Sequence, residues 1–90
     1  MYYATDRQTA ERVLNDLRSS RLDDRATALA TLQRIRNEAA CERSGEQLRM
    51  HAWLAIRNLY DACKAAPERD LKPLWQDAIA RTLAWQQSMR

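Results

Sequence analysis

Apolar residues recur at intervals of three and four in four separate stretches of the chain. This spacing places apolar side chains on one side of a helix. It predicts helices over residues 6–19, 24–43, 46–66 and 71–89. The expected core-facing residues are Ala10, Val13, Leu14 and Leu17; Ala28, Leu32, Ile35 and Ala39; Leu48, Ala52, Ala55, Ile56, Leu59, Ala62, Cys63 and Ala66; and Leu71, Trp75, Ala78, Thr82, Trp85 and Met89.

The stretch 46–66 is apolar over the widest part of its circumference. A helix of this kind usually packs against more than one neighbour. We therefore expect it to be the central element of the fold.

Residues that favour helix starts precede these stretches. Pro67 ends the third helix, because proline lacks an N–H and disfavours a helical residue before it. The candidate caps are Thr5 with Gln8, Asp23 or Asp24, Ser44 with Gln47, and Asp70, with Pro73 in the first turn of the last helix.

Gly45 separates the second and third stretches. One unbroken helix through it is an alternative, since a mid-helix glycine costs only about 1 kcal/mol. However, continuing the helix from Ala28 to Leu48 turns the apolar face by about half a turn. A turn at Gly45 that folds the third helix back on the second is therefore the better interpretation.

The composition favours helices alone, with one Gly, two Pro and no Phe in 90 residues. We predict an all-α fold, a compact antiparallel bundle of about four helices forming a single domain over residues 1–90. An α-solenoid is less well supported, because no repeat pattern is visible. The start of the chain has no secretory signal, and the longest apolar run, Ala52–Ile56, is far short of the roughly 20 residues that span a bilayer. We expect a soluble, cytoplasmic protein that does not enter a membrane.

Residues suited to catalysis or metal binding are scarce. His51 is the only histidine and has no carboxylate or cysteine at helical spacing. In an antiparallel hairpin Cys41 and Cys63 lie roughly 20 Å apart, too far for a disulfide, so both thiols should be reduced. These two cysteines and the Asp23–Asp24 pair do not form a metal-ligand set. We expect no enzyme activity, cofactor, metal or small-molecule substrate.

Basic and aromatic residues share one flank of the 46–66 helix. Fifteen basic and twelve acidic residues give a formal charge of only +3, a mild bias. The flank suits single-stranded nucleic acid, with cations on phosphates and rings on bases. Alternatively, the rings pack against a neighbouring helix and the long basic side chains cover them. A helix-turn-helix at Ser44–Gly45 is a weaker possibility, because the following helix is too apolar for a recognition helix. The flank comprises Arg49, Trp53, Arg57, Tyr60 and Lys64, and a secondary basic row comprises Arg25, Arg36 and Arg43.

Met50, Leu54 and Leu83 are apolar but fall outside the predicted core stripes. If they are exposed, they form a patch suited to a partner, either a second copy or another protein. If the core is wider than the stripes, it absorbs them. The sequence leaves both possibilities open.

No stretch carries a motif specific enough to identify a family. The leading expectation is a small non-enzymatic protein that binds another protein as an adaptor, a subunit or an inhibitor of a larger complex, and its size fits a phage or mobile-element protein. Nucleic-acid binding through the same flank is the alternative. The expected partner-binding residues are Arg49, Met50, Trp53, Leu54, Arg57, Tyr60 and Lys64.

Overall fold

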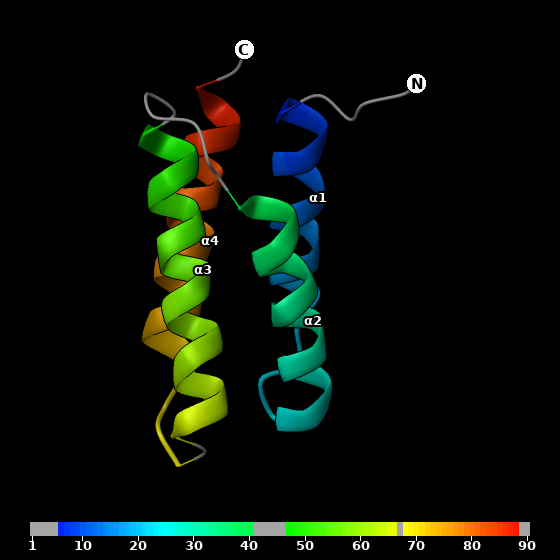
Figure 1. Ribbon diagram of the computed structural model, residues 1–90, viewed down its shortest axis with the longest axis vertical. Helices are drawn as coiled ribbons and strands as arrows, with labels where there is room; N and C mark the ends of the chain where they lie inside the picture. Colours follow the sequence, from blue (N-terminus) through cyan, green and yellow to red (C-terminus); the bar gives the residue numbers. More distant parts are fainter. Residues whose placement is uncertain (1–5, 41–46, 67, 89–90) are drawn as a thin grey trace.

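Four helices make up the described part of the chain in a computed structural model, which covers residues 6–40, 47–66 and 68–88. In chain order they are α1 (Asp6–Ser19), α2 (Arg25–Ala39), α3 (Gln47–Ala65) and α4 (Lys72–Gln87). Successive helices run in opposite directions (Figure 1). The predicted all-α antiparallel bundle is confirmed.

The helices form a ring around the core. α1 and α3 each pack against both α2 and α4, and no close backbone approach joins diagonally opposite helices in the described residues. In Figure 1, α2 and α3 form the front layer, with α1 and α4 behind them. As expected, α3 packs against more than one neighbour, but it is not more central than the others, because every helix of the ring has two neighbours. The wide apolar face of α3 is shared between two neighbours, as its position at a corner of the ring requires.

The predicted stripes supply most of the core. Tyr60 also belongs to the core, because it is only 8% exposed, although the sequence placed it on the basic and aromatic flank. Leu48 was predicted to face the core, and this was wrong, because it is 41% exposed near the start of α3. Trp75 and Ala66 are only half-buried, and Met89 lies outside the described residues. The core residues that match the prediction are Ala10, Val13, Leu14, Leu17, Ala28, Leu32, Ile35, Ala39, Ala52, Ala55, Ile56, Leu59, Ala62, Cys63, Leu71, Ala78, Thr82 and Trp85.

Asp24, rather than Asp23, caps α2. Its Oδ1 accepts a hydrogen bond from the Thr27 backbone N–H at 3.2 Å, and its Oδ2 accepts one from the Thr27 hydroxyl at 2.8 Å. The first turn of a helix has unpaired N–H groups, which such a side chain satisfies. The two bonds from Thr27, the hydroxyl bond first, lower the pKa of Asp24 from its ordinary value of 3.8.

The end of α2 differs from the prediction. Helix was expected to about residue 43, but Ala40 has φ −49° and ψ 133°, which takes the backbone out of the helix. The rest of that prediction, residues 41–43, lies outside the described residues. The same holds for the expected caps Thr5 and Ser44.

The start of α4 also differs in detail. Leu71 is the cap residue, and its carbonyl accepts the Trp75 N–H at 2.9 Å. Asp70 still contributes, because its Oδ1 accepts the Lys72 N–H at 3.0 Å. Pro73 lies in the first turn as predicted, where its missing N–H costs nothing.

The Asp24 cap makes stability depend on pH. Because folding lowers the pKa of Asp24, its contribution is present above about pH 4 and is lost as the pH falls through the folded-state pKa. Asn also caps helices but does not titrate in this range. We expect the Tm difference between wild type and Asp24→Asn to shrink in thermal unfolding from about pH 6 to about pH 2. A difference that stays constant or grows would contradict this role.

Thr82 places a hydroxyl in the core. The residue is 0% exposed, and its Oγ1 has no hydrogen-bond partner in residues 6–40, 47–66 and 68–88. An unsatisfied buried polar group costs free energy that an apolar group of the same shape avoids. Thr82→Val should therefore raise the free energy of unfolding by about 1 kcal/mol in urea titrations. As a control, Thr82→Ser, which keeps the hydroxyl and removes the methyl, should lower it by about 1 kcal/mol. A Val variant less stable than wild type would show that the hydroxyl is satisfied.

Candidate interaction surface

Tyr60 is the most deeply buried member of the predicted flank. Its ring packs into the core cluster, and the guanidinium carbon of Arg36 from α2 lies 4.7 Å from its centroid. This is a cation–π contact between two neighbouring helices. Tyr60 therefore helps to join α2 to α3, and its ring has no free face for a partner.

Arg49 is used to close the end of α2. Its Nε donates to the Ala39 carbonyl at 3.2 Å, and its Nη2 donates to the carbonyls of Glu38 at 3.3 Å and Ala40 at 3.1 Å. The last carbonyls of a helix have no partner within the helix, and a cation there also suits the helix dipole. The guanidinium carbon lies 5.2 Å from the Trp85 ring centroid, so Arg49 links α2, α3 and α4.

Trp53, Arg57 and Lys64 lie further from the core. Trp53 is half-buried and packs against the core cluster, while Arg57 and Lys64 are exposed. The guanidinium carbon of Arg57 lies 5.6 Å from the Trp53 ring centroid. The ring therefore packs on the core at one side and has an exposed charged side chain near its other side.

The three apolar residues outside the stripes are all half-buried: Met50, Leu54 and Leu83. They are thus neither core residues nor a fully exposed patch. Leu48, which the sequence had placed in the core, is the exposed large apolar residue of the described part of the chain.

His51 is exposed and lies on the opposite side of α3 from the basic flank. It lines a shallow hollow between α3 and α4. Arg81 and Asp77 in this hollow already pair with each other at 3.1 Å. The lining residues are His51, Leu54, Ala55, Asn58, Asp77 and Arg81.

The predicted secondary basic row separates in the structure. Arg36 joins the flank through Tyr60. Arg25 instead donates from Nη2 to the Arg69 carbonyl at 2.7 Å, joining the start of α2 to the α3–α4 connection. Its own carbonyl accepts from the buried free thiol of Cys63 at 3.9 Å. Arg43 and Cys41 lie outside the described residues.

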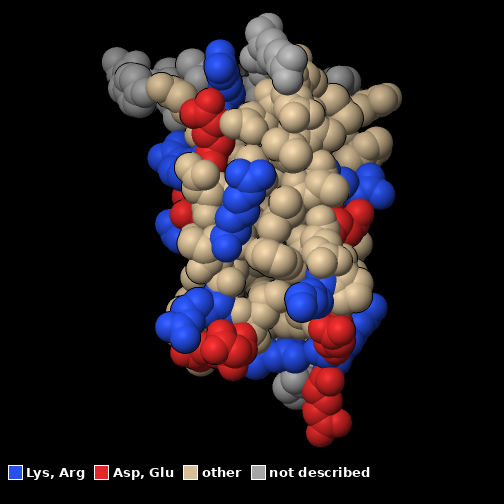
Figure 2. Space-filling view, turned by 180° about the vertical axis from the view of Figure 1, so that it is seen from behind, with Lys and Arg blue, Asp and Glu red and all other residues tan. Residues whose placement is uncertain are grey.

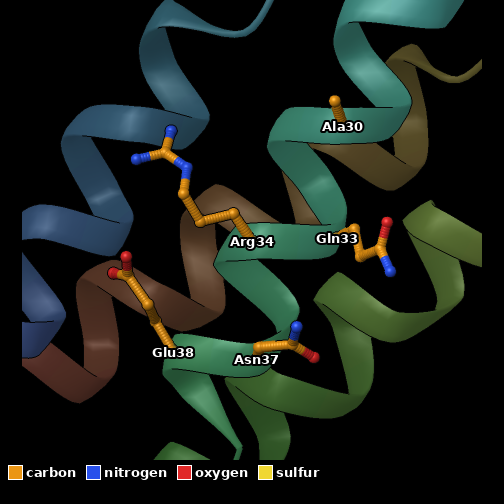
Figure 3. A pocket seen from close by; sticks show the side chains of 5 residues that line it. All are labelled: Ala30, Gln33, Arg34, Asn37 and Glu38. Atoms are coloured by element: carbon orange, nitrogen blue, oxygen red, sulfur yellow. The ribbon is translucent and has the colours of Figure 1, made fainter.

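The ionic interactions are unevenly distributed around the bundle. Arg12–Glu38 at 3.7 Å and Arg34–Asp16 at 3.4 Å join α1 to α2. Figure 3 shows Arg34 and Glu38 directed toward α1, whereas Gln33 and Asn37 lie on the side of α2 near α3. These four residues and Ala30 line a shallow hollow. The α1–α4 face has basic and acidic groups side by side at its edges and lower end (Figure 2).

The side of the bundle formed by α2 and α3 has unpaired cations. Within the described residues, Arg36, Arg57 and Lys64 make no ion pair with a carboxylate, and Asp61 is an exposed acid on the same side of α3. We call Arg36, Met50, Trp53, Leu54, Arg57 and Lys64 the α3 surface. It keeps the apolar and cationic parts of the predicted site without Arg49 and Tyr60.

Two side-chain roles were not anticipated. Trp75 donates from Nε1 to the Leu17 carbonyl at 2.7 Å, which joins α4 to the last turn of α1. Arg25 bonds the Arg69 carbonyl as described above. Both depend on distant segments meeting, and neither has a local spacing signal in the sequence.

The described helices include none that is long and apolar enough to cross a membrane. Nor do the described residues include a group of three or more His, Cys, Asp or Glu side chains that could hold a metal ion. Comparison with known proteins found no family model, curated protein or solved structure that matches this chain.

Arg49 and Arg57, eight positions apart on one helix, should differ in their effect on stability. Arg49→Met leaves the carbonyls at the end of α2 without their charged donor and should lower the free energy of unfolding by about 2–3 kcal/mol. Arg57→Met is the matched control and should cost less than about 1 kcal/mol, because its guanidinium contacts one partly exposed ring. Urea unfolding of the two variants measures both values. Equal losses would contradict the structural role assigned to Arg49.

Proposed function

We propose that this chain acts by binding another protein, and that the α3 surface is its binding site. The observation that carries the proposal is the half-buried Trp53 beneath an exposed Arg57, with further unpaired cations beside them. Trp and Arg are enriched among the residues that dominate protein–protein binding energy. Met50 and Leu54 add apolar area next to them.

Nucleic-acid binding is the second candidate, favoured by Arg36, Arg57 and Lys64, which form no ion pair with any carboxylate in the described part of the chain. Stacking on unpaired bases needs rings with a free face. Tyr60 is buried and Arg49 is bonded to the end of α2, so one partly covered ring and three cations remain. We therefore favour a protein partner.

A non-enzymatic role accompanies this proposal. His51 is exposed, and in the described part of the chain it makes no hydrogen bond to a carboxylate that would orient it as a base. Asp77, which lines the same hollow, pairs with Arg81. An adaptor, a subunit or an inhibitor of a larger complex fits a small bundle with one binding surface.

Charge reversal at the α3 surface tests the proposal. Wild type and variants are expressed in cells, crosslinked to the proteins that they contact and purified. The variant Arg57→Glu/Lys64→Glu should no longer capture the proteins that the wild type captures, because both side chains are exposed on the proposed site. The matched control Arg7→Glu/Arg18→Glu reverses two exposed charges on α1 and should retain them. Quantitative mass spectrometry compares the three samples.

The outcome against the proposal is a captured set that is the same for all three proteins, or one that disappears after nuclease treatment. Fluorescence anisotropy with labelled single- and double-stranded DNA and RNA addresses the second candidate directly. A nucleic-acid site should bind below about 1 μM and weaken by orders of magnitude as salt rises. We expect no such binding.

A further inference from the structure

We infer that the partner of the α3 surface is an acidic, amphipathic protein segment that has an apolar anchor followed by carboxylates. The inference rests on the proposed function and specifies its partner. The α3 surface is divided along the helix: Met50, Trp53 and Leu54 lie in its first half, and Arg57 and Lys64 in its second. A complementary segment must be divided in the same way.

The length of the surface sets the spacing within the partner. At 1.5 Å per residue, Arg57 lies about 6 Å and Lys64 about 16 Å along the helix axis from Trp53. The partner's carboxylates should therefore lie about one to three helical turns from its apolar anchor, or about two to five residues away in an extended segment.

Charge complementarity favours an acidic segment. Within residues 6–40, 47–66 and 68–88, five other arginines pair with carboxylates: Arg7, Arg12, Arg21, Arg34 and Arg81. The α3 surface has three cations without such a partner among the residues that the structure describes, and the neighbouring Asp61 offsets only one of them in net charge. A carboxylate can bond the N–H groups of Arg57 while its guanidinium carbon stays near the Trp53 ring, 5.6 Å from the centroid.

A second copy of the chain fits this surface poorly. A symmetric dimer brings the same patch of both copies together, so the surface with Arg36, Arg57 and Lys64 would face a surface of the same net positive charge. Like charges placed together in an interface cost binding energy. Nucleic acid shares the negative charge of the inferred segment, but it lacks an apolar anchor for Met50 and Leu54.

Selection from a displayed library of random peptides identifies the partner chemistry without a known partner. The immobilised bait is the full chain, and the counter-selection bait is Arg57→Glu/Lys64→Glu. We expect enriched peptides to contain Asp or Glu one to three turns from Leu, Ile, Met, Phe or Trp. A synthetic representative should bind at least about tenfold more weakly to the double variant, a difference of about 1.4 kcal/mol. Its affinity for the control Arg7→Glu/Arg18→Glu should be unchanged.

Each other outcome overturns the inference in a recognisable way. Peptides that need the α3 surface but have no excess of acidic residues would refute the acidic partner and leave the proposed function intact. Peptides that bind both baits equally would refute both. Displacement of the peptide by single-stranded DNA at physiological salt would also refute both, since it would assign the surface to nucleic acid. A dimer in sedimentation that the double variant dissociates would assign it to a second copy.

Discussion

The unpaired carbonyls at helix ends are the constraint on which this bundle depends. The last four carbonyls of a helix have no partner inside it, and in a short helix these carbonyls are a large fraction of the total. Here side chains from other helices donate at two helix ends: Arg49 bonds the last carbonyls of α2, and Trp75 bonds the Leu17 carbonyl in the last turn of α1, which also accepts the Ser20 N–H. Arg25 makes a similar bond to the Arg69 carbonyl in the α3–α4 connection. These bonds join segments that are distant in the sequence, so the ends of the bundle are tied together as well as its core.

This constraint divides the basic and aromatic flank of α3 into two parts. Arg49 is bonded to α2 and lies over Trp85, and the Tyr60 ring is buried beneath Arg36. Trp53 and Arg57 contact each other on the outer side of the same helix. Residues that share one spacing in the sequence therefore serve two purposes. The inner part holds the helices together, and the outer part is available to a partner.

The fold and most of its core could be predicted from the sequence, because helical spacing and caps are local properties. The α1 boundaries, the Asp24 cap and the core stripe of α2 follow from residues within a few positions of one another. The early end of α2 does not, since the donor that bonds its carbonyls, Arg49, lies ten residues beyond Ala39. The division of the site was hidden for the same reason: Tyr60 is buried because Arg36 and α2 lie over it, which the sequence of α3 alone does not specify.

The most direct test of this division is hydrogen exchange at the arginine side chains, measured by NMR on the Nε–H signals. The Nε–H of Arg49 donates to the Ala39 carbonyl at 3.2 Å in a half-buried position, whereas Arg57 is exposed. We expect the Arg49 signal to exchange with water much more slowly than that of Arg57 and to persist until the protein unfolds. Equally fast exchange at both arginines would contradict this division, because Arg49 would then be as free as Arg57 and the flank would be a single surface.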